Sequence, residues 1–392
     1  MPIYTSLAHR TPNRSFPSPL TNLTSVLLIA AAAAMSLTSA ALAQPTITNI
    51  GVLPGGTASF FPVINANGTA VGGTSSGVGN VSAIRWTAGG GAQNLGSLFG
   101  GNTQSQAINA DGTVIAGYSA LPGSARAFRW TAADGMQNLG GLAGAGGAYS
   151  AAQGISADGA HIVGVADTAG GDTHAVRWHA GSIEDLGTLT GGTFSSATGI
   201  SADASTIVGN SNDADGNFVA VRWTSGGGIA SLGVLSGFEG SDAFATSANG
   251  SVIVGFSYLN DFTSFTASRW TAAGGQQSLG ALGTDVQSIA SSVTADGSII
   301  TGSSFDSTNV SRAVLWSSAL GIVDLNLYLP TLGVDLTGWS LQDASISADG
   351  TALTGNGTFN GEGRIWLVTS IPTPGAASVL ALGGLVASRR RR

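Results

Sequence analysis

The chain has 392 residues, no cysteine and no lysine, and only 9% of its residues are charged. Disulfides, cysteine nucleophiles and lysine bases are therefore excluded by composition. Between residues 44 and 388, eight arginines stand against all 21 carboxylates, a formal charge of −13. This balance is opposite to that of a nucleic-acid-binding protein, so we expect no nucleic-acid partner.

Residues 1–43 have the pattern of a secretory signal. A long lead with two arginines precedes an apolar core at 23–35, and an A-x-A-type cleavage site follows. The pattern predicts export through the Sec machinery, with a permanent membrane anchor as the alternative. The expected cleavage site is formed by Ala41, Ala43 and Gln44.

One pattern then occurs seven times between residues 47 and 368. An Asx-Gly type turn is followed by a short apolar run and, about 20 residues later, by a tryptophan. The tryptophans, 44 to 50 residues apart, are Trp86, Trp130, Trp178, Trp223, Trp270, Trp316 and Trp366. The turns begin at Asn67, Asp111, Asp158, Asp203, Asn249, Asp296 and Asp349. Such a period indicates small units that stack on one another because none can bury a core alone.

The unit is read most clearly between residues 195 and 235. Runs of β-branched and aromatic residues separated by Gly, Asn and Asp predict four antiparallel strands and no helix. These strands are Ser195–Ser201, Thr206–Asn210, Phe218–Thr224 and Ile229–Leu235. Four strands in this length make a propeller blade; a sandwich or a β-solenoid is the alternative.

The two ends of the array predict how the ring closes. Ile47–Leu53 resembles a fourth strand without its first three, and the seventh unit ends after its third strand, Arg364–Thr369. We therefore expect the N-terminal strand to complete the last blade, which leaves no open edge. The predicted fold is all-β: a monomeric seven-bladed β-propeller of four-stranded antiparallel blades over residues 44–370.

Each repeat tryptophan is expected to fill the space between neighbouring blades. An arginine precedes most of them and should also meet a neighbouring blade, because adjacent strand residues point to opposite faces. An unpaired buried guanidinium is costly, so we expect each arginine to bind a turn aspartate or backbone carbonyls. These arginines are Arg85, Arg129, Arg177, Arg222 and Arg269, with Arg364 shifted by one position.

Residues 371–392 have three parts: a proline motif, an uncharged apolar run at 376–388 and a basic end. The run alone is shorter than the roughly 20 residues that span a bilayer, and the arginines should stay on the cytoplasmic side. The pattern predicts transient membrane insertion by a short apolar helix late in export. The motif is Pro372, Thr373, Pro374 and Gly375, and the basic stop is Arg389, Arg390, Arg391 and Arg392.

This tail resembles the PEP-CTERM sorting signal of Gram-negative bacteria, with Thr373 where that family usually has glutamate. The resemblance implies cleavage by an exosortase near the proline motif, location at the cell surface or outside the cell, and association with exopolysaccharide. The repeats resemble the HAF-type extracellular repeat family, as in His174–Trp178 and Arg126–Trp130 with the Leu-Gly elements that follow. That family has no known catalytic residues that could be assigned to positions of this sequence.

The sequence has few residues that could form a metal site or a catalytic site. His161 and His179 could face each other across a hairpin, with His174 nearby, but two imidazoles fall short of a zinc site. The oxygen-rich stretch 212–217 has the look of a calcium loop without its distal glutamate. We expect no cofactor, with calcium as the alternative, and no catalytic residue is assigned.

The sequence therefore favours an exported, non-enzymatic module of the cell surface or extracellular matrix, structural or polysaccharide-binding. The alternatives are a secreted lyase or glycosidase on the same scaffold and a spacer without a ligand. Asp, Arg and His converging at one mouth of the channel would favour the enzyme, and evenly spread Asp would favour binding. Candidate ligand-contacting aromatics, for which a packing role is the alternative, are Phe99, Tyr118, Tyr149, Phe238 and Tyr258.

Overall fold

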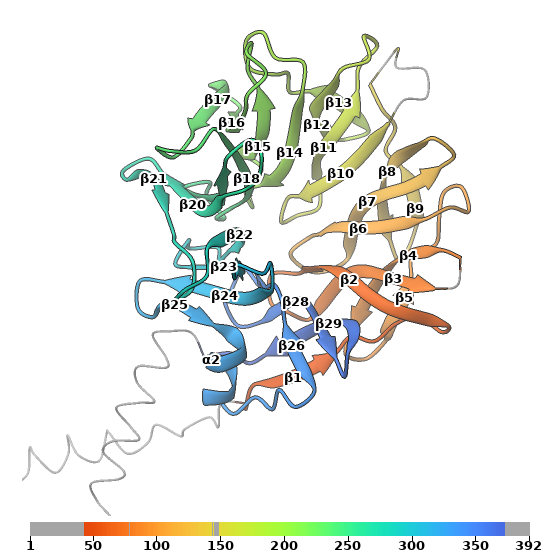
Figure 1. Cartoon of the computed structure of the whole chain (residues 1–392). Helices are drawn as coiled ribbons and strands as arrows, with labels where there is room; N and C mark the ends of the chain where they lie inside the picture. Colours follow the sequence, from red (N-terminus) through yellow and green to blue (C-terminus); the bar gives the residue numbers. More distant parts are fainter. Residues whose placement is uncertain (1–42, 78, 143, 145–148, 373–392) are drawn as a thin grey trace, which may run out of the picture. The chain divides into compact units, whose positions relative to one another are not determined.

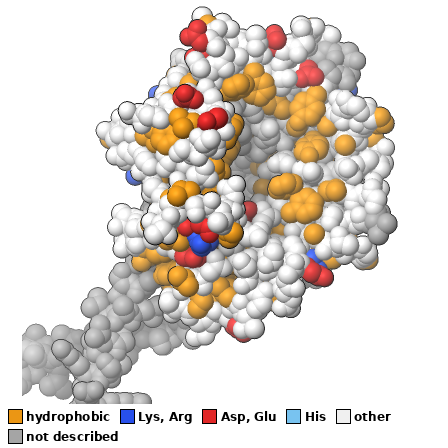
Figure 2. Space-filling model, viewed as in Figure 1, with side chains coloured by type: hydrophobic (Ala, Val, Ile, Leu, Met, Phe, Trp, Pro, Cys, Tyr) orange, Lys and Arg blue, Asp and Glu red, His pale blue; other side chains and the backbone are white. Residues whose placement is uncertain are grey.

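The computed structural model describes residues 43–77, 79–142, 144 and 149–372. They form seven antiparallel sheets arranged as the blades of a propeller (Figure 1). In the space-filling view the middle of the ring is hollowed (Figure 2). The predicted fold class, with its blade number and strand number, is confirmed.

Blades 1 to 3 each have four strands in sequence order. Blade 1 consists of β2 (Gly56–Ile64), β3 (Ala70–Gly77), β4 (Val81–Thr87) and β5 (Gly91–Asn94). Blade 2 consists of β6 (Thr103–Ile108), β7 (Val114–Leu121), β8 (Ser124–Thr131) and β9 (Gly135–Asn138). Blade 3 consists of β10 (Ser150–Ile155), β11 (His161–Asp167), β12 (Thr173–His179) and β13 (Ser182–Asp185).

Blades 4 to 6 repeat this order. Blade 4 consists of β14 (Ser195–Ile200), β15 (Thr206–Asn212), β16 (Phe218–Thr224) and β17 (Gly228–Gly233), within two residues of the predicted strands. Blade 5 consists of β18 (Gly240–Thr246), β19 (Val252–Tyr258), β20 (Phe265–Thr271) and β21 (Gly275–Ser278). Blade 6 consists of β22 (Gln287–Val293), β23 (Ile299–Phe305), β24 (Ser311–Ser317) and β25 (Gly321–Asp324).

Blade 7 is built from both ends of the propeller. Its strands are β26 (Trp339–Leu341), β27 (Ser345–Ile346), β28 (Leu353–Phe359), β29 (Glu362–Thr369) and β1 (Thr46–Asn49). β26 and β27 both pair with β28 and together replace a single inner strand. β1 pairs antiparallel with β29, in the register Ile47 to Val368, so the predicted closure by the N-terminal strand is confirmed.

A closed ring of backbone hydrogen bonds also runs through the Asx turns of the seven blades. In each turn the residue before the Asx is alanine, and in six turns its N–H donates to the carbonyl of the equivalent alanine in the next blade. The first of these bonds, from Ala66 to Ala110, is 3.2 Å long. This ring of bonds closes where the N–H of Asp349 donates to the carbonyl of Ala66 at 3.1 Å. Seven backbone bonds therefore join the seven blades around the axis.

Besides the backbone bonds of the Asx turns, side-chain hydroxyl groups also form hydrogen bonds between neighbouring blades. These bonds were not predicted from the sequence. The Ser195 Oγ of blade 4 accepts from the N–H of Ala175 in blade 3 and donates to the carbonyl of Gly187. Six of the seven junctions have the first of these bonds. The hydroxyl residues are Ser59, Thr103, Ser150, Ser195, Ser241 and Ser288. Their regular position after the Leu-Gly element was the signal that could have identified them.

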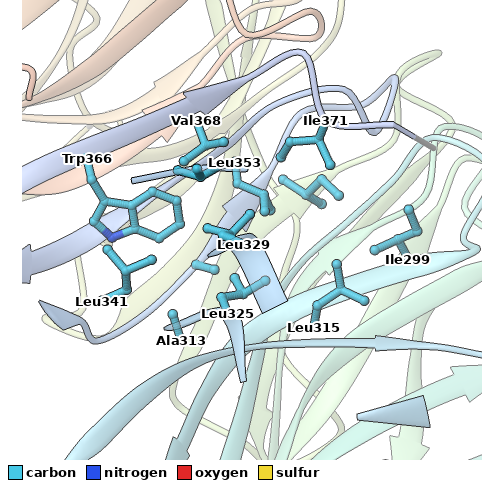
Figure 3. Packing of buried hydrophobic residues seen from close by; sticks show 13 residues of the cluster. Ile299, Ala313, Leu315, Leu325, Leu329, Leu341, Leu353, Trp366, Val368 and Ile371 are labelled. Carbon is cyan, nitrogen blue, oxygen red and sulfur yellow. The ribbon is translucent and has the colours of Figure 1, made fainter. Parts of the chain in front are cut away.

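Each repeat tryptophan packs against the preceding blade. Trp223, for example, lies in a cluster with Val163 and Ala175 of blade 3. Six of the seven are at most 5% exposed, and Trp86 packs partly buried against its cluster. The largest cluster joins blades 6 and 7 around Trp366 (Figure 3). Buried apolar surface between the blades therefore stabilises the ring.

One helix contradicts the expectation of an all-strand repeat region. α2 (Leu325–Thr331) follows blade 6, with the Asp324 carboxylate capping its N-terminus by accepting from the N–H of Asn326. Leu325 and Leu329 are buried in the blade 6–7 cluster. The helix has only seven residues and contains Pro330. Tertiary packing therefore stabilises it where periodicity gives no signal.

Candidate binding site at the channel mouth

The Asx residues of the turns are structural. The Asp203 carboxylate accepts from the hydroxyls of Ser201 and Ser205 and from the N–H of Ser205. These bonds, the one from Ser201 foremost, hold the pKa of Asp203 at about 2. Similar bonds lower the pKa values of Asp111, Asp158 and Asp296. The regular spread of Asp that the sequence shows is thus explained by turn formation and carries no ligand argument.

We expect this set of turns to make the fold sensitive to acid. Their carboxyl pKa values are lowered in the folded state, so the stability they supply is present above about pH 4 and is lost as the pH falls through the lowered pKa values, which for Asp203 is about 2. The melting temperature should therefore drop over that range, and less steeply in Asp203→Asn, which removes one of these titrations. A melting temperature that stays constant from pH 4 to pH 2 would show that the turns do not contribute in this way.

The central channel is narrow and lined by the inner strands. A cavity of 230 Å³ lies along it, lined by residues of all seven blades. The residue two positions before each turn alanine is Ile in five blades, including Ile108, Ile155 and Ile200, and these three line the cavity. Apolar side chains and the hydroxyl groups of serine and threonine therefore surround this cavity.

A pocket of 410 Å³ lies among blades 6, 7 and 1. Its blade 1 residues, 58–61, belong to the first half of the inner strand β2, at the end opposite the Asx turn; we call this end of the channel the mouth. A volume of this size accommodates a small ligand. Figure 2 shows hydrophobic side chains bordering the central hollow. The pocket is lined by Ala58, Ser59, Phe60, Phe61, Ser303, Phe305, Ser311, Gln342, Asp343, Asn356, Gly357 and Gly363. Aromatic rings, amides and hydroxyls thus surround one carboxyl group.

The carboxyl group of this pocket organises its wall. Asp343 accepts from the backbone N–H and the Nδ2 of Asn356, both at 2.6 Å. The Oδ1 of Asn356 in turn accepts from the N–H of Phe61 at 3.0 Å. Burial raises the pKa of Asp343. This chain of hydrogen bonds runs from blade 7 to blade 1 and fixes the backbone at Phe61.

Phe61 is held in an unfavourable conformation at the pocket. Its φ is +56°, a region that costs a non-glycine residue roughly 1–3 kcal/mol. The residue is 51% exposed, and its ring meets that of Phe60 edge-on at a centroid distance of 5.0 Å. A large apolar ring that is both strained and exposed favours a role in contacting a ligand.

The aromatic residues proposed from the sequence as ligand contacts lie elsewhere than Phe61. Phe99 and Tyr149 are 48% and 36% exposed. Tyr258 is 5% exposed and stacks on Phe262, which is the packing role that its alternative assignment expected. None of the five selected aromatics lines the mouth pocket. Phe60 and Phe61 line the pocket but were not predicted from the sequence, where an adjacent aromatic pair on the innermost strand was the available signal.

The residues considered as candidate metal ligands make contacts within the protein. His161 and His179 do face each other, with rings stacked at 3.9 Å, and burial followed by the charge of His179 lowers the pKa of His161. His174 binds Asp185. The Asp213 carboxylate accepts from two N–H groups of its own hairpin turn. In the described residues, no three His, Asp or Glu side chains converge as a metal site would require.

The expected arginine ties are only partly correct. The Nε of Arg85 donates to the carbonyl of Gly112 in the turn of the next blade, at 2.7 Å, and Arg364 donates to the carbonyl of Thr57. Arg177 instead binds Glu184 of its own blade, and the Nε of Arg269 is buried without a partner in the described structure. Arg177 bonds within its own blade because Glu184 stands opposite it in the register of β12 and β13.

The sequence signals at the two ends fall largely outside the described residues. This applies to Ala41, to Thr373, Pro374 and Gly375, and to the four terminal arginines. Ile371, assigned to the tail, is described and packs in the blade 6–7 cluster, with its N–H donating to the carbonyl of Thr351. In the described part of the chain, no helix is long and apolar enough to cross a membrane.

No protein-family model and no curated protein matches this sequence. Several solved structures resemble it. The oligogalacturonate lyase of Vibrio parahaemolyticus has a TM-score of 0.54 at 11% identity over 82% of this chain and 93% of its own. An oligogalacturonate lyase in complex with manganese gives 0.54 at 11% identity over 82% and 92%.

A putative TolB of Agrobacterium tumefaciens gives a TM-score of 0.44 at 16% identity over 60% of this chain and 88% of its own. The lyase comparisons establish a common fold. That fold is a β-propeller. At these identities the likeness carries no activity, since one scaffold supports many functions.

Proposed function

We propose that this protein is an exported, non-enzymatic propeller of the cell surface or extracellular matrix that binds polysaccharide at the mouth of its channel. The observation that carries the proposal is Phe61, an exposed ring held at positive φ inside a pocket of aromatic, amide and hydroxyl groups. Such linings combine apolar contact with a few oriented polar groups, as ligand pockets require. A sugar ring, apolar on its faces and polar at its edge, fits that combination.

Export is supported by the sequence signals at residues 1–43 and 371–392. The partners in this proposal are the Sec machinery, an exosortase-type sorting protease and exopolysaccharide, with transient membrane insertion of the C-terminal segment. The mass of the C-terminus of secreted protein tests the sorting step. Secreted protein that retains Arg389–Arg392 would contradict it.

Binding at the mouth predicts a specific mutational pattern. Phe61→Ala should weaken polysaccharide binding at least about tenfold, the effect of removing a well-placed aromatic anchor. Phe262→Ala is the matched control, because Phe262 has a φ of +54° and is 57% exposed but lies outside the pocket. A glycan array identifies a ligand, and titration calorimetry of each variant then measures its affinity.

Glycine at position 61 separates strain from binding. Phe61→Gly should lose binding as Phe61→Ala does, but should keep or raise the melting temperature, because glycine adopts positive φ without cost. Unchanged affinity in both variants would contradict a site at the mouth.

The same protein, incubated with oligogalacturonate, tests the alternative of a lyase. Formation of unsaturated products that is lost in Asp343→Asn would replace the binding proposal by the enzymatic one.

A further inference from the structure

Three equivalent grooves lie between neighbouring blades, near the Asx turns and away from the channel mouth. Each is lined by the arginine of one blade, the Asx turn of the next blade and the tryptophan of that next blade. Their volumes are 550 Å³ between blades 2 and 3, 210 Å³ between blades 3 and 4, and 430 Å³ between blades 5 and 6. The arginine and tryptophan pairs are Arg129 with Trp178, Arg177 with Trp223, and Arg269 with Trp316.

In the smallest groove, between blades 3 and 4, acceptors of the protein itself bind the donor groups of the arginine and the tryptophan. Glu184 Oε2 accepts from the Nε of Arg177 at 2.9 Å and from its Nη2 at 2.5 Å. The indole Nε1 of Trp223 donates to the carbonyl of Leu186 at 3.0 Å. In this groove, a carboxylate therefore binds the guanidinium and a carbonyl binds the indole.

The groove between blades 5 and 6 has the same donors without these acceptors. In the described structure, the Nε of Arg269 and the Nε1 of Trp316 are buried and have no hydrogen-bond partner. Trp316 is only 5% exposed. Gln277 stands opposite Arg269 in the strand register, where Glu184 stands opposite Arg177. An uncharged amide thus replaces the carboxylate, and the cavity is larger.

Unpaired donors of this kind are unfavourable unless something binds them. A buried polar group without a partner costs about 1–3 kcal/mol. A carboxylate accepts well from guanidinium N–H groups. Glu184 shows that a carboxylate is accommodated at the equivalent place in this scaffold.

The groove between blades 2 and 3 repeats the arrangement. Its arginine, Arg129, faces Gln137 in the strand register, and the Nε1 of Trp178 is buried with no partner in the described residues. Two grooves of one molecule therefore combine an arginine opposite a glutamine with an indole N–H that has no partner in the described residues. Two weak sites on one polymer chain strengthen each other through effective concentration.

We propose that the Arg269–Trp316 groove, and with it the Arg129–Trp178 groove, binds the carboxylate of an acidic saccharide such as a hexuronate. These subsites are separate from the channel mouth. Only the choice of a saccharide as the carrier of the carboxylate rests on the proposed function.

The indole N–H signals of the full chain in ¹H–¹⁵N NMR spectra test this proposal, with oligogalacturonate as the probe. The signals of Trp316 and Trp178, assigned by substitution to phenylalanine, should shift saturably, whereas that of Trp223 should not, because its N–H is already bound. Neutral galactose oligomers should shift none of them. Equal shifts with the neutral probe, or shifts with a poly-glutamate peptide and none with oligogalacturonate, would overturn the proposal.

Three variants sharpen the result. Arg269→Gln should weaken the Trp316 site at least tenfold, and Arg177→Gln, the matched control, should leave that site unchanged. Gln277→Glu should supply an internal carboxylate, as Glu184 does, and abolish the Trp316 shift in a folded protein. Retained binding in Arg269→Gln or Gln277→Glu would contradict the assignment. Phe61→Ala should not affect these shifts, so failure at the mouth and failure in the grooves can be told apart.

Discussion

A chain that starts at residue 54 is expected to be largely unfolded or to self-associate, whereas one that starts at residue 44 is fully stable. The shorter chain lacks β1 and the apolar side chains of Ile47, Ile50 and Leu53, which pack at the two junctions of blade 7. Ile50 is buried and Ile47 and Leu53 are partly buried, so the three side chains together contribute roughly 3–6 kcal/mol. A domain has a net stability of only about 5–15 kcal/mol, so their loss, together with the hydrogen bonds of β1, removes a large part of it.

Loss of β1 also leaves β29 as an open edge, which favours pairing with another molecule. Urea unfolding of both truncated proteins measures the difference in stability, and size-exclusion chromatography detects self-association. The same urea midpoint for both proteins, with both monomeric, would show that the N-terminal strand does not hold the ring closed.

Trp223→Ala is expected to lower the free energy of unfolding by about 3–5 kcal/mol, the usual cost of truncating a buried large aromatic side chain. Trp223 is 4% exposed and packs on residues of blade 3. Its indole N–H also bonds the carbonyl of Leu186 in that blade. The substitution therefore leaves a cavity and an unpaired carbonyl at the same junction.

Phe99→Ala is the control for this loss, because Phe99 is 48% exposed and should change stability by less than about 0.5 kcal/mol. Chemical denaturation of both variants gives the comparison. A similar small effect at both positions would mean that the repeat tryptophans do not join the blades.

The architecture could be predicted from the sequence because each weak local pattern occurs seven times at a regular spacing. One Asp-Gly turn predicts little, but seven turns with seven tryptophans at a regular spacing define the blade and its number. The closing strand was predictable because Ile47–Leu53 looks like a fourth strand and the last unit lacks one. Both arguments depend on local turn and strand chemistry.

The features that define the candidate sites were not predictable in the same way. The conformation of Phe61 depends on Asn356, far away in the chain, and no local pattern encodes that contact. The unpaired Nε of Arg269 follows from a single residue on the neighbouring strand, Gln277 in place of a glutamate. α2 escaped prediction because seven residues form a helix only when packed against blades 6 and 7.

A single engineered disulfide tests the closed ring most directly, since the chain has no cysteine of its own. Thr46 and Thr369 are partners in the register of β1 and β29, so Thr46→Cys with Thr369→Cys should form an intramolecular bond under mild oxidation and raise the melting temperature. Mass spectrometry of the digested protein should find the two ends linked. Free thiols after oxidation, or a bond only between two molecules, would contradict a propeller closed by its own N-terminal strand.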